Sequence, residues 1–77
     1  MSRLANCNHT ARVVRALERA GFIAEPGTNH TVMRRPDGRY TTVPRHRRVK
    51  PGLLRLILKQ CGLSEDEFLV LYHGKQV

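Results

Sequence analysis

The chain has 77 residues and a formal net charge of +8, and hydrophobic residues make up 40% of the sequence. A chain of this length forms one domain at most, and it buries only about 60–65% of the surface that it exposes when unfolded. Its apolar runs are shorter than the ~18–20 residues that a membrane-spanning helix needs, and its N-terminus lacks the apolar stretch of a secretory signal. We therefore expect a cytoplasmic α+β domain with a small aliphatic core.

The positive charge is concentrated in one part of the chain. Residues 34–50 carry seven cationic side chains and one carboxylate, whereas the last 16 residues carry three carboxylates and one lysine. A concentrated positive field favours a polyanionic partner, most often nucleic acid. The alternative is a basic face that interacts only with solvent.

The first predicted element is a helix over residues 11–20, preceded by a loose segment over residues 1–9. Thr10 is the expected N-cap, and Gly21 is expected to end the helix in a left-handed conformation. The apolar residues of the helix recur at i, i+3, i+4 and i+7 and form one stripe: Val13, Ala16, Leu17 and Ala20. Its arginines fall on the opposite side, where we expect them to face water: Arg12, Arg15 and Arg19.

Three short strands are predicted next, over residues 22–24, 30–35 and 39–43. Pro36 and Asp37 precede Gly38 between the last two strands, which is a hairpin signal because glycine accepts the positive φ that such turns require. Alternation along the second strand places Met33 toward the core. The same alternation places His30 and Arg34 together on the opposite, open face.

The second half of the chain is predicted to be helical. A basic loop over residues 44–51 leads into a helix over residues 51–60, which has a proline in its first turn and Gly62 as its cap. Ser64 and Glu67 form a capping-box motif, which indicates a short final helix that ends near Gly74. The chain thus predicts one helix, three strands and two further helices.

The apolar residues of the helix over residues 51–60 indicate which side is buried. Leu54, Ile57, Leu58 and Cys61 form its main stripe, so Cys61 is expected to be a buried structural thiol. Cys7 falls in the segment expected to be loose, and the two cysteines lack the spacing of a disulfide framework. Leu53 and Leu56 widen the apolar face, and either the final helix covers them or they form a surface for a partner protein.

Four stretches carry a resemblance to a known family: GTNH at 27–30, MRRPDGR at 33–39, TTVPRH at 41–46 and KPGLLRLILKQCGLSEDEF at 50–68. They resemble the HicA-type toxins, the small RNA-cleaving halves of bacterial toxin–antitoxin pairs, and the resemblance extends from Val13 to Leu69. It implies a fold like the double-stranded-RNA-binding domain. That fold has α-β-β-β-α order, with a three-stranded antiparallel sheet packed on two helices, and here a short C-terminal helix follows.

The resemblance also implies an activity and a partner. Toxins of this family act as ribosome-independent mRNA endonucleases that arrest growth or translation. Their activity depends on one histidine that follows a Gly-Ser-like loop and begins the second strand. Their partner is a HicB-type antitoxin, which covers that histidine and, here, the basic face. No cofactor, membrane or small-molecule substrate is implied.

The loop before the expected catalytic residue departs from the family pattern. The usual Gly-Ser-His-His appears here as Gly27, Thr28, Asn29 and His30. Alignment from the glycine places Asn29 at the catalytic position, whereas alignment from the hairpin turn places His30 there. A loop absorbs an inserted residue more easily than a paired strand absorbs a register slip, which would reverse every side chain. We therefore predict that His30 is the catalytic residue.

RNA cleavage without a metal requires a base for the 2′-OH proton, an acid for the leaving 5′-oxygen, and positive charge around the phosphorane. A histidine with a pKa near ~6.5 performs either proton transfer at neutral pH. Cations supply the electrostatic stabilisation, and Arg34 is the expected phosphate clamp beside His30. The four histidines lack metal-ligand spacing, so no metal is expected.

The remaining basic residues are expected to bind RNA through its phosphates. His46 is a candidate for a second proton-transfer group, but contact with RNA is the favoured role. The predicted RNA-binding set is Arg34, Arg35, Arg45, His46, Arg47, Arg48 and Lys50. Such contacts give a steep salt dependence and little sequence specificity. The competing hypothesis is a binding module of the same fold that holds RNA without cleaving it.

Overall fold

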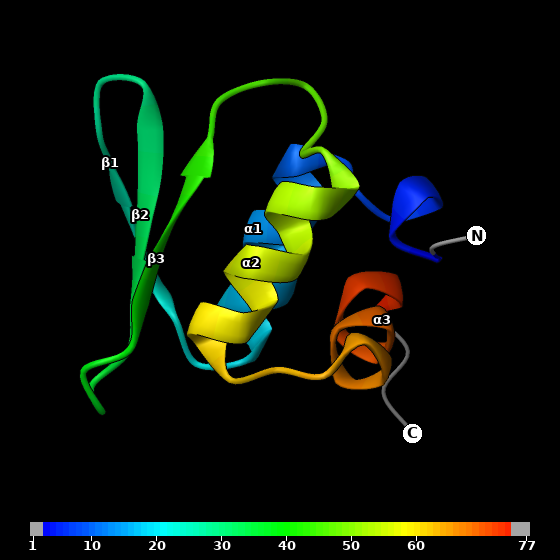
Figure 1. Ribbon diagram of the computed structural model, residues 1–77. Helices are drawn as coiled ribbons and strands as arrows, with labels where there is room; N and C mark the ends of the chain where they lie inside the picture. The colour runs from blue at the N-terminus through cyan, green and yellow to red at the C-terminus, as the bar shows by residue number, and fades with distance from the viewer. Residues whose placement is uncertain (1–2, 75–77) are drawn as a thin grey trace.

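A computed structural model describes residues 3–74, and its elements follow the predicted order after a short 3-10 turn (Figure 1). They are η1 (Arg3–Asn6), α1 (Thr10–Arg19), β1 (Ile23–Pro26), β2 (His30–Arg34), β3 (Tyr40–Pro44), α2 (Pro51–Cys61) and α3 (Glu65–His73). The strands form one antiparallel sheet in the order β1-β2-β3. The predicted α+β fold class, which is consistent with the fold of the double-stranded-RNA-binding domain, is confirmed.

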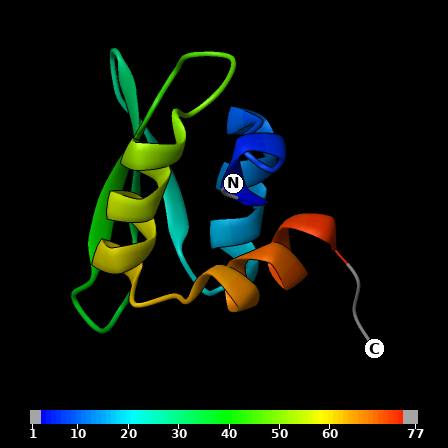
Figure 2. The same ribbon diagram turned by 45° about the vertical axis from the view of Figure 1, so that its right-hand side comes forward.

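The structure has a sheet on one side and helices on the other. Helices α1 and α2 lie side by side against one face of the sheet, and α3 lies beyond them (Figures 1 and 2). Aliphatic side chains from the sheet and both helices fill the space between them and form the core: Val13, Ala16, Leu17, Met33, Val43, Leu54, Ile57 and Leu58. None of the described helices covers the other face of the sheet (Figure 1), which we call the outer face.

The hairpin between β2 and β3 has the predicted turn. The backbone N–H of Arg35 donates to the carbonyl of Arg39 at 2.9 Å, and Gly38 has a φ of +94°. The register pairs His30 with Pro44 and Arg34 with Tyr40. Each strand begins or ends one or two residues away from its predicted bound, because turn residues outside the alternating pattern extend or shorten the pairing.

Alternation along β2 follows the prediction. Met33 is fully buried, whereas His30 and Arg34 are exposed on the outer face. Met33 fills the centre of the core, so a slip of one residue would expose it and bury two polar side chains. The burial of Met33 therefore determines that His30 and Arg34 lie on the outer face.

The caps of α2 and α3 form as predicted. Gly62 ends α2 in the left-handed conformation, and the Ser64 hydroxyl accepts from the Glu67 N–H while the Glu67 carboxylate accepts from the Ser64 N–H. The hydrogen bonds from Ser64 lower the pKa of Glu67. Cys61 is a buried thiol, as expected, and burial raises its pKa to about 11.

The predicted loose segment over residues 1–9 is wrong for residues 4–9. Leu4 is fully buried in the core, Cys7 and Asn8 are nearly so, and Cys7 Sγ lies 3.7 Å from His73 Nε2. The Asn8 side chain donates to the carbonyl of Val49 at 2.8 Å, and the Asn8 carbonyl accepts from the Val49 N–H. These contacts join positions about forty residues apart or more, so local periodicity gave no sign of them.

The predicted N-cap of the first helix is also wrong. Helix α1 begins at Thr10, and its N-cap is His9, whose side chain makes no capping bond. The Thr10 hydroxyl is instead buried and has no hydrogen-bond partner among the residues that the structure describes. The Thr10 N–H donates to the carbonyl of Arg47, so a long-range backbone contact replaces the local cap.

Helix α3 packs on α1 and leaves the outer side of α2 uncovered. Leu53 and Leu56 are therefore 38% and 49% exposed, so the first of the two alternatives, that the final helix covers them, is wrong. The arginines on α1 are exposed, as predicted, and two of them, Arg12 and Arg19, also donate to backbone carbonyls at the end of α3. Of the helices within residues 3–74, none has the length and hydropathy that crossing a membrane requires.

Candidate functional site

His30 begins β2 and lies on the outer face at the end of the sheet away from the hairpin. A tight turn holds it there, because the Gly27 N–H donates to the His30 carbonyl at 2.8 Å. A Cβ added at Gly27 would lie 2.6 Å from the same carbonyl oxygen, closer than packed atoms approach. Glycine at position 27 is therefore needed for the turn that places His30.

A hollow of about 320 Å³ surrounds His30. It is lined by two segments that are remote in sequence: Thr28, Asn29 and His30 before and within β2, and Pro44, Arg45 and His46 at the end of β3. The Arg45 N–H donates to the Asn29 carbonyl at 3.3 Å and ties the two segments together. The lining contains two imidazoles and a guanidinium but no carboxylate, so it presents proton-transfer groups in a positive environment.

The hollow brings His46 to His30. The sequence placed these residues in separate segments, and only the β2–β3 register, in which His30 pairs with Pro44, puts His46 beside the same opening. Asn29 lines the hollow as well, so both candidates for the catalytic position are at the site. The spacing of Pro44 and His46 was visible in the sequence, but their distance from His30 was not.

The structure does not bring Arg34 to His30. The two residues share the outer face, but they lie four positions apart on β2, which corresponds to about 13 Å between their Cα atoms. The Arg34 guanidinium pairs with Glu25 at 2.6 Å and lies 5.7 Å from the centre of the Tyr40 ring. The expected phosphate clamp is thus at the hairpin end of the strand, where a carboxylate neutralises it.

The Arg35 side chain contacts several groups within the fold. Its guanidinium pairs with Asp37 at 2.6 Å, donates to the Ala20 carbonyl and lies 4.9 Å from the centre of the Phe22 ring. The hydrogen bond from Arg35, with a second from the Arg39 N–H, lowers the pKa of Asp37 to about 2, and the bond to Asp37 raises the pKa of Arg35. This arginine joins the hairpin to the end of α1, so its guanidinium already has partners within the fold.

The other predicted RNA-binding cations lie in the segment between β3 and α2. Val49 is fully buried and anchors this segment, while the polar side chains around it are exposed: Arg45, His46, Arg47, Arg48 and Lys50. Arg48 makes a long hydrogen bond of 3.5 Å to Asn8. Within residues 3–74, the side chains of Arg45, Arg47 and Lys50 have neither a hydrogen bond nor an ion pair. These three cations are therefore available to a ligand.

No group of three His, Cys, Asp or Glu side chains in the described part of the chain is placed to hold a metal ion. The carboxylates of the hairpin end pair with arginines, and those of α3 lie at its first turn. The arrangement around His30 therefore offers imidazole and guanidinium groups as its chemically active side chains.

The comparison with protein families agrees with this geometry. The family model described as the HicA toxin of bacterial toxin–antitoxin systems matches residues 10–63, which span α1 through the cap of α2. The match includes both sides of the hollow around His30 and the whole cationic segment. No curated protein is similar enough to the chain to be identified as a relative.

Proposed function

The chain belongs to the HicA toxin family, so it is a toxin of a bacterial toxin–antitoxin system, and from this premise we propose that it is an endoribonuclease that cleaves mRNA without a ribosome or a metal. The observation that carries the proposal is the hollow that His30, His46 and Arg45 share without a carboxylate. A carboxylate-free, cationic hollow with two imidazoles suits a phosphodiester, because it supplies both proton transfer and charge stabilisation. Because the proposed substrate is bacterial mRNA, the toxin would act in the cytoplasm.

In the proposed reaction, His30 takes the proton from a ribose 2′-OH, and the resulting oxygen attacks the adjacent phosphorus. The bond to the 5′-oxygen breaks, and that oxygen takes up the proton that His30 acquired from the 2′-OH, which returns His30 to its neutral form. The strand is left with a cyclic phosphate on one side and a 5′-hydroxyl on the other. Arg45 stabilises the negative charge that develops on the phosphorane. His46 contacts the phosphate from the other side of the hollow and fixes the strand relative to His30.

Free cations beside the hollow extend the RNA contact. Arg47 and Lys50 follow on the same exposed segment, and they bind phosphates that flank the cleaved bond. Because these contacts are electrostatic, the binding constant depends steeply on salt and little on sequence. The buried side chain of Val49 anchors this cationic segment to the core.

A toxin of this family works with an antitoxin. We propose that the antitoxin covers His30 and the exposed cations Arg45, Arg47 and Lys50, so that RNA and antitoxin compete for one surface. Purified antitoxin added to the chain should therefore displace bound RNA, and RNA in excess should slow antitoxin binding. Simultaneous binding of both without loss of affinity would contradict a shared surface.

Inducible expression in bacteria of the wild type, His30→Ala and Asn29→Ala tests the catalytic assignment. General acid–base catalysis contributes about 10²–10⁴-fold to a rate, so His30→Ala should abolish growth arrest and mRNA loss at equal protein level. Asn29→Ala, the matched control on the same turn, should remain toxic. The reverse pattern would show that Asn29 holds the catalytic position.

Cleavage of purified RNA in EDTA tests the remaining parts of the proposal. The wild type should cleave, and the products should carry 5′-hydroxyl ends. His46→Ala should weaken RNA binding while the rate at saturating RNA changes little, because its proposed role is contact. A loss of rate at saturating RNA together with a changed pH profile would instead make His46 a proton-transfer group. A chain that binds RNA but never cleaves it would be the non-catalytic module.

A further inference from the structure

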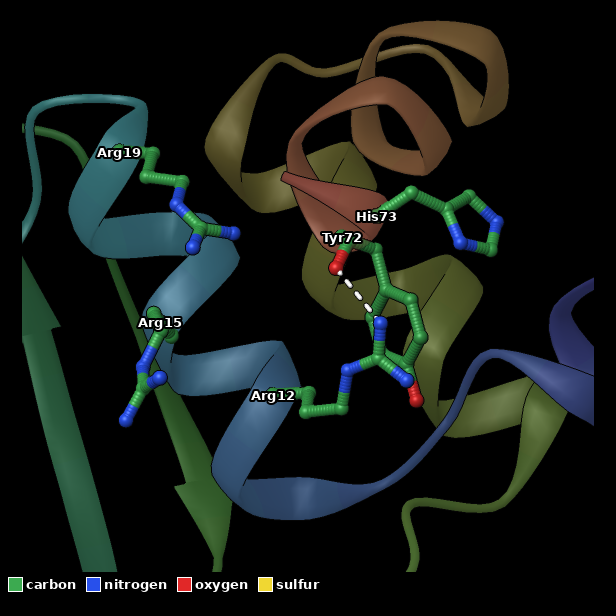
Figure 3. A pocket seen from close by; sticks show the side chains of 5 residues that line it. All are labelled: Arg12, Arg15, Arg19, Tyr72 and His73. Carbon is green, nitrogen blue, oxygen red and sulfur yellow. Dashed lines mark hydrogen bonds between the residues drawn. The ribbon is translucent and has the colours of Figure 1, made fainter. Parts of the chain in front are cut away.

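Three arginines line a second hollow, on the other side of α1 from the core. Arg12, Arg15 and Arg19 come from successive turns of the helix, and Tyr72 and His73 at the end of α3 complete the lining. The side chains of Arg12 and Arg19 extend toward α3, whereas that of Arg15 points away from it (Figure 3). The hollow has a volume of about 260 Å³, and the described residues of its lining include no carboxylate. The site around His30 does not account for this cluster.

Two of these arginines have a structural role. Arg12 donates to the Tyr72 carbonyl at 3.2 Å and stacks over the Tyr72 ring at 4.3 Å from its centre (Figure 3). Arg19 donates to the Leu71 carbonyl at 2.7 Å. The last carbonyls of a helix carry partial negative charge and lack partners within the helix. Arg12 and Arg19 satisfy them and fasten α3 to α1.

Arg15 is not explained in this way. It is exposed, and no residue of the described chain forms a hydrogen bond or an ion pair with its side chain. It lies three residues after Arg12 and four before Arg19, which are the spacings at which like charges on a helix destabilise one another. Phosphate groups bound along this row of arginines would reduce that repulsion.

The position of Arg15 connects the second hollow with the first. Ala11 and Val14, its neighbours on the exposed side of α1, line a groove whose other wall includes Arg45, His46 and Arg47. That groove shares Arg45 and His46 with the hollow around His30. A strand leaving the His30 hollow along this groove therefore reaches α1 next to Arg15.

We propose that the arginine hollow binds backbone phosphates of the same RNA strand whose cleaved phosphate lies at His30. This inference rests on the proposed function, and it names how the site extends along its substrate. Guanidinium groups match phosphate oxygens in charge and geometry. Arg15 supplies the free fork, and the outward edges of Arg12 and Arg19 add charge without releasing α3.

The contributions of the two hollows to RNA binding can be measured separately by using RNAs of two lengths, because only the longer RNA can reach both. At about 3.4 Å per stacked nucleotide, a trinucleotide spans roughly 10 Å and a dodecanucleotide about 41 Å, whereas the longest dimension of the protein is 31 Å. Binding is measured with full-length His30→Ala, so that the RNA stays intact. Arg15→Gln in this background should weaken dodecanucleotide binding about fivefold and flatten its log–log salt slope by about 0.7. Trinucleotide binding should not change.

Arg55→Gln is the matched control, because Arg55 is an exposed arginine on α2 outside all of these hollows. It should change neither affinity by more than about twofold, and circular dichroism should show both variants folded. An unchanged dodecanucleotide affinity in Arg15→Gln would overturn the proposal, as would equal losses for both lengths. A third outcome would also overturn it: Arg15→Gln weakens the binding of inorganic phosphate or of the antitoxin but leaves RNA binding unchanged. If neither RNA binds at all, the proposed function fails as well.

Discussion

Both ends of the sheet carry several cationic side chains. At the hairpin end these side chains pair with carboxylates, whereas at the other end, among the residues that the structure describes, they do not. At the hairpin end, Arg34 pairs with Glu25, and Arg35 and Arg39 both approach Asp37. Two carboxylates offset most of the charge of these three arginines, and the ion pairs order the turn and its contact with α1. A polyanion that approaches this end meets few free positive groups.

At the opposite end, the cations have no carboxylate partner within residues 3–74. Arg45 and His46 line the hollow around His30, and Arg47 and Lys50 continue beyond it. The segment that carries them is held by the buried side chain of Val49. The difference shows that charge counted along the chain overstates the number of unpaired cations, because carboxylate partners decide which cations remain available.

The largest expected effect comes from replacing one glycine at each end of the sheet, Gly27 beside His30 and Gly38 in the hairpin. Gly27→Ala places a Cβ against the His30 carbonyl oxygen, so the turn must open and His30 must move. A displacement of about 1 Å can lower a rate roughly 10²-fold, and we expect a loss of that order in kcat/KM for RNA. The matched variant Gly38→Ala strains a backbone with a φ of +94° and should lower the free energy of unfolding by roughly 1–2 kcal/mol.

Gly38→Ala should nevertheless keep its cleavage activity at a temperature where it is folded. Steady-state cleavage of a fluorogenic RNA and denaturant unfolding measure the two effects separately. Equal loss of activity in both variants would mean that the hairpin and the His30 turn are not independent. Wild-type activity in Gly27→Ala would mean that the turn does not position the catalytic group.

A smaller effect on RNA affinity is expected when cations are removed from one end of the sheet or from the other. The double variant Arg45→Gln/Arg47→Gln should weaken RNA binding about tenfold and flatten the log–log salt slope by about 1.4, since each contact to a single strand contributes about 0.7. Arg34→Gln/Arg39→Gln removes the same charge from the hairpin end and should change affinity by less than about twofold. Equal losses in the two double variants, measured by fluorescence anisotropy across a salt series, would show that only net charge matters.

The smallest expected effect concerns the pH dependence of the hairpin end. The pKa of Asp37 is about 2 in the folded chain and 3.8 ordinarily. A carboxyl whose pKa falls on folding stabilises the fold above its unfolded pKa, and that contribution disappears as the pH falls through its folded pKa. Asp37→Asn should therefore unfold at lower denaturant than the wild type at neutral pH. The gap should close between about pH 4 and pH 2, and a gap that stays constant to pH 2 would contradict the assigned ion pair.

Several features of the fold and site were readable from the sequence because they depend on local chemistry. The capping box at Ser64, the turn at Gly38 and the left-handed cap at Gly62 each follow from a few adjacent residues. The burial of Met33 opposite an exposed His30 follows from strand alternation. Features that depend on distant partners were missed, and the burial of Leu4 is the clearest of them.

The sequence by itself determined the order of the elements, the excess of cations and the presence of a histidine at the start of the second strand. Each of these is set by neighbouring residues or by simple composition. The tertiary structure decided which cations are free, because ion pairs with Glu25 and Asp37 form across strands and turns. It also decided that His46 lies beside His30 and that Arg15 lies in a second hollow, since the strand register and the packing of α3 on α1 set both positions.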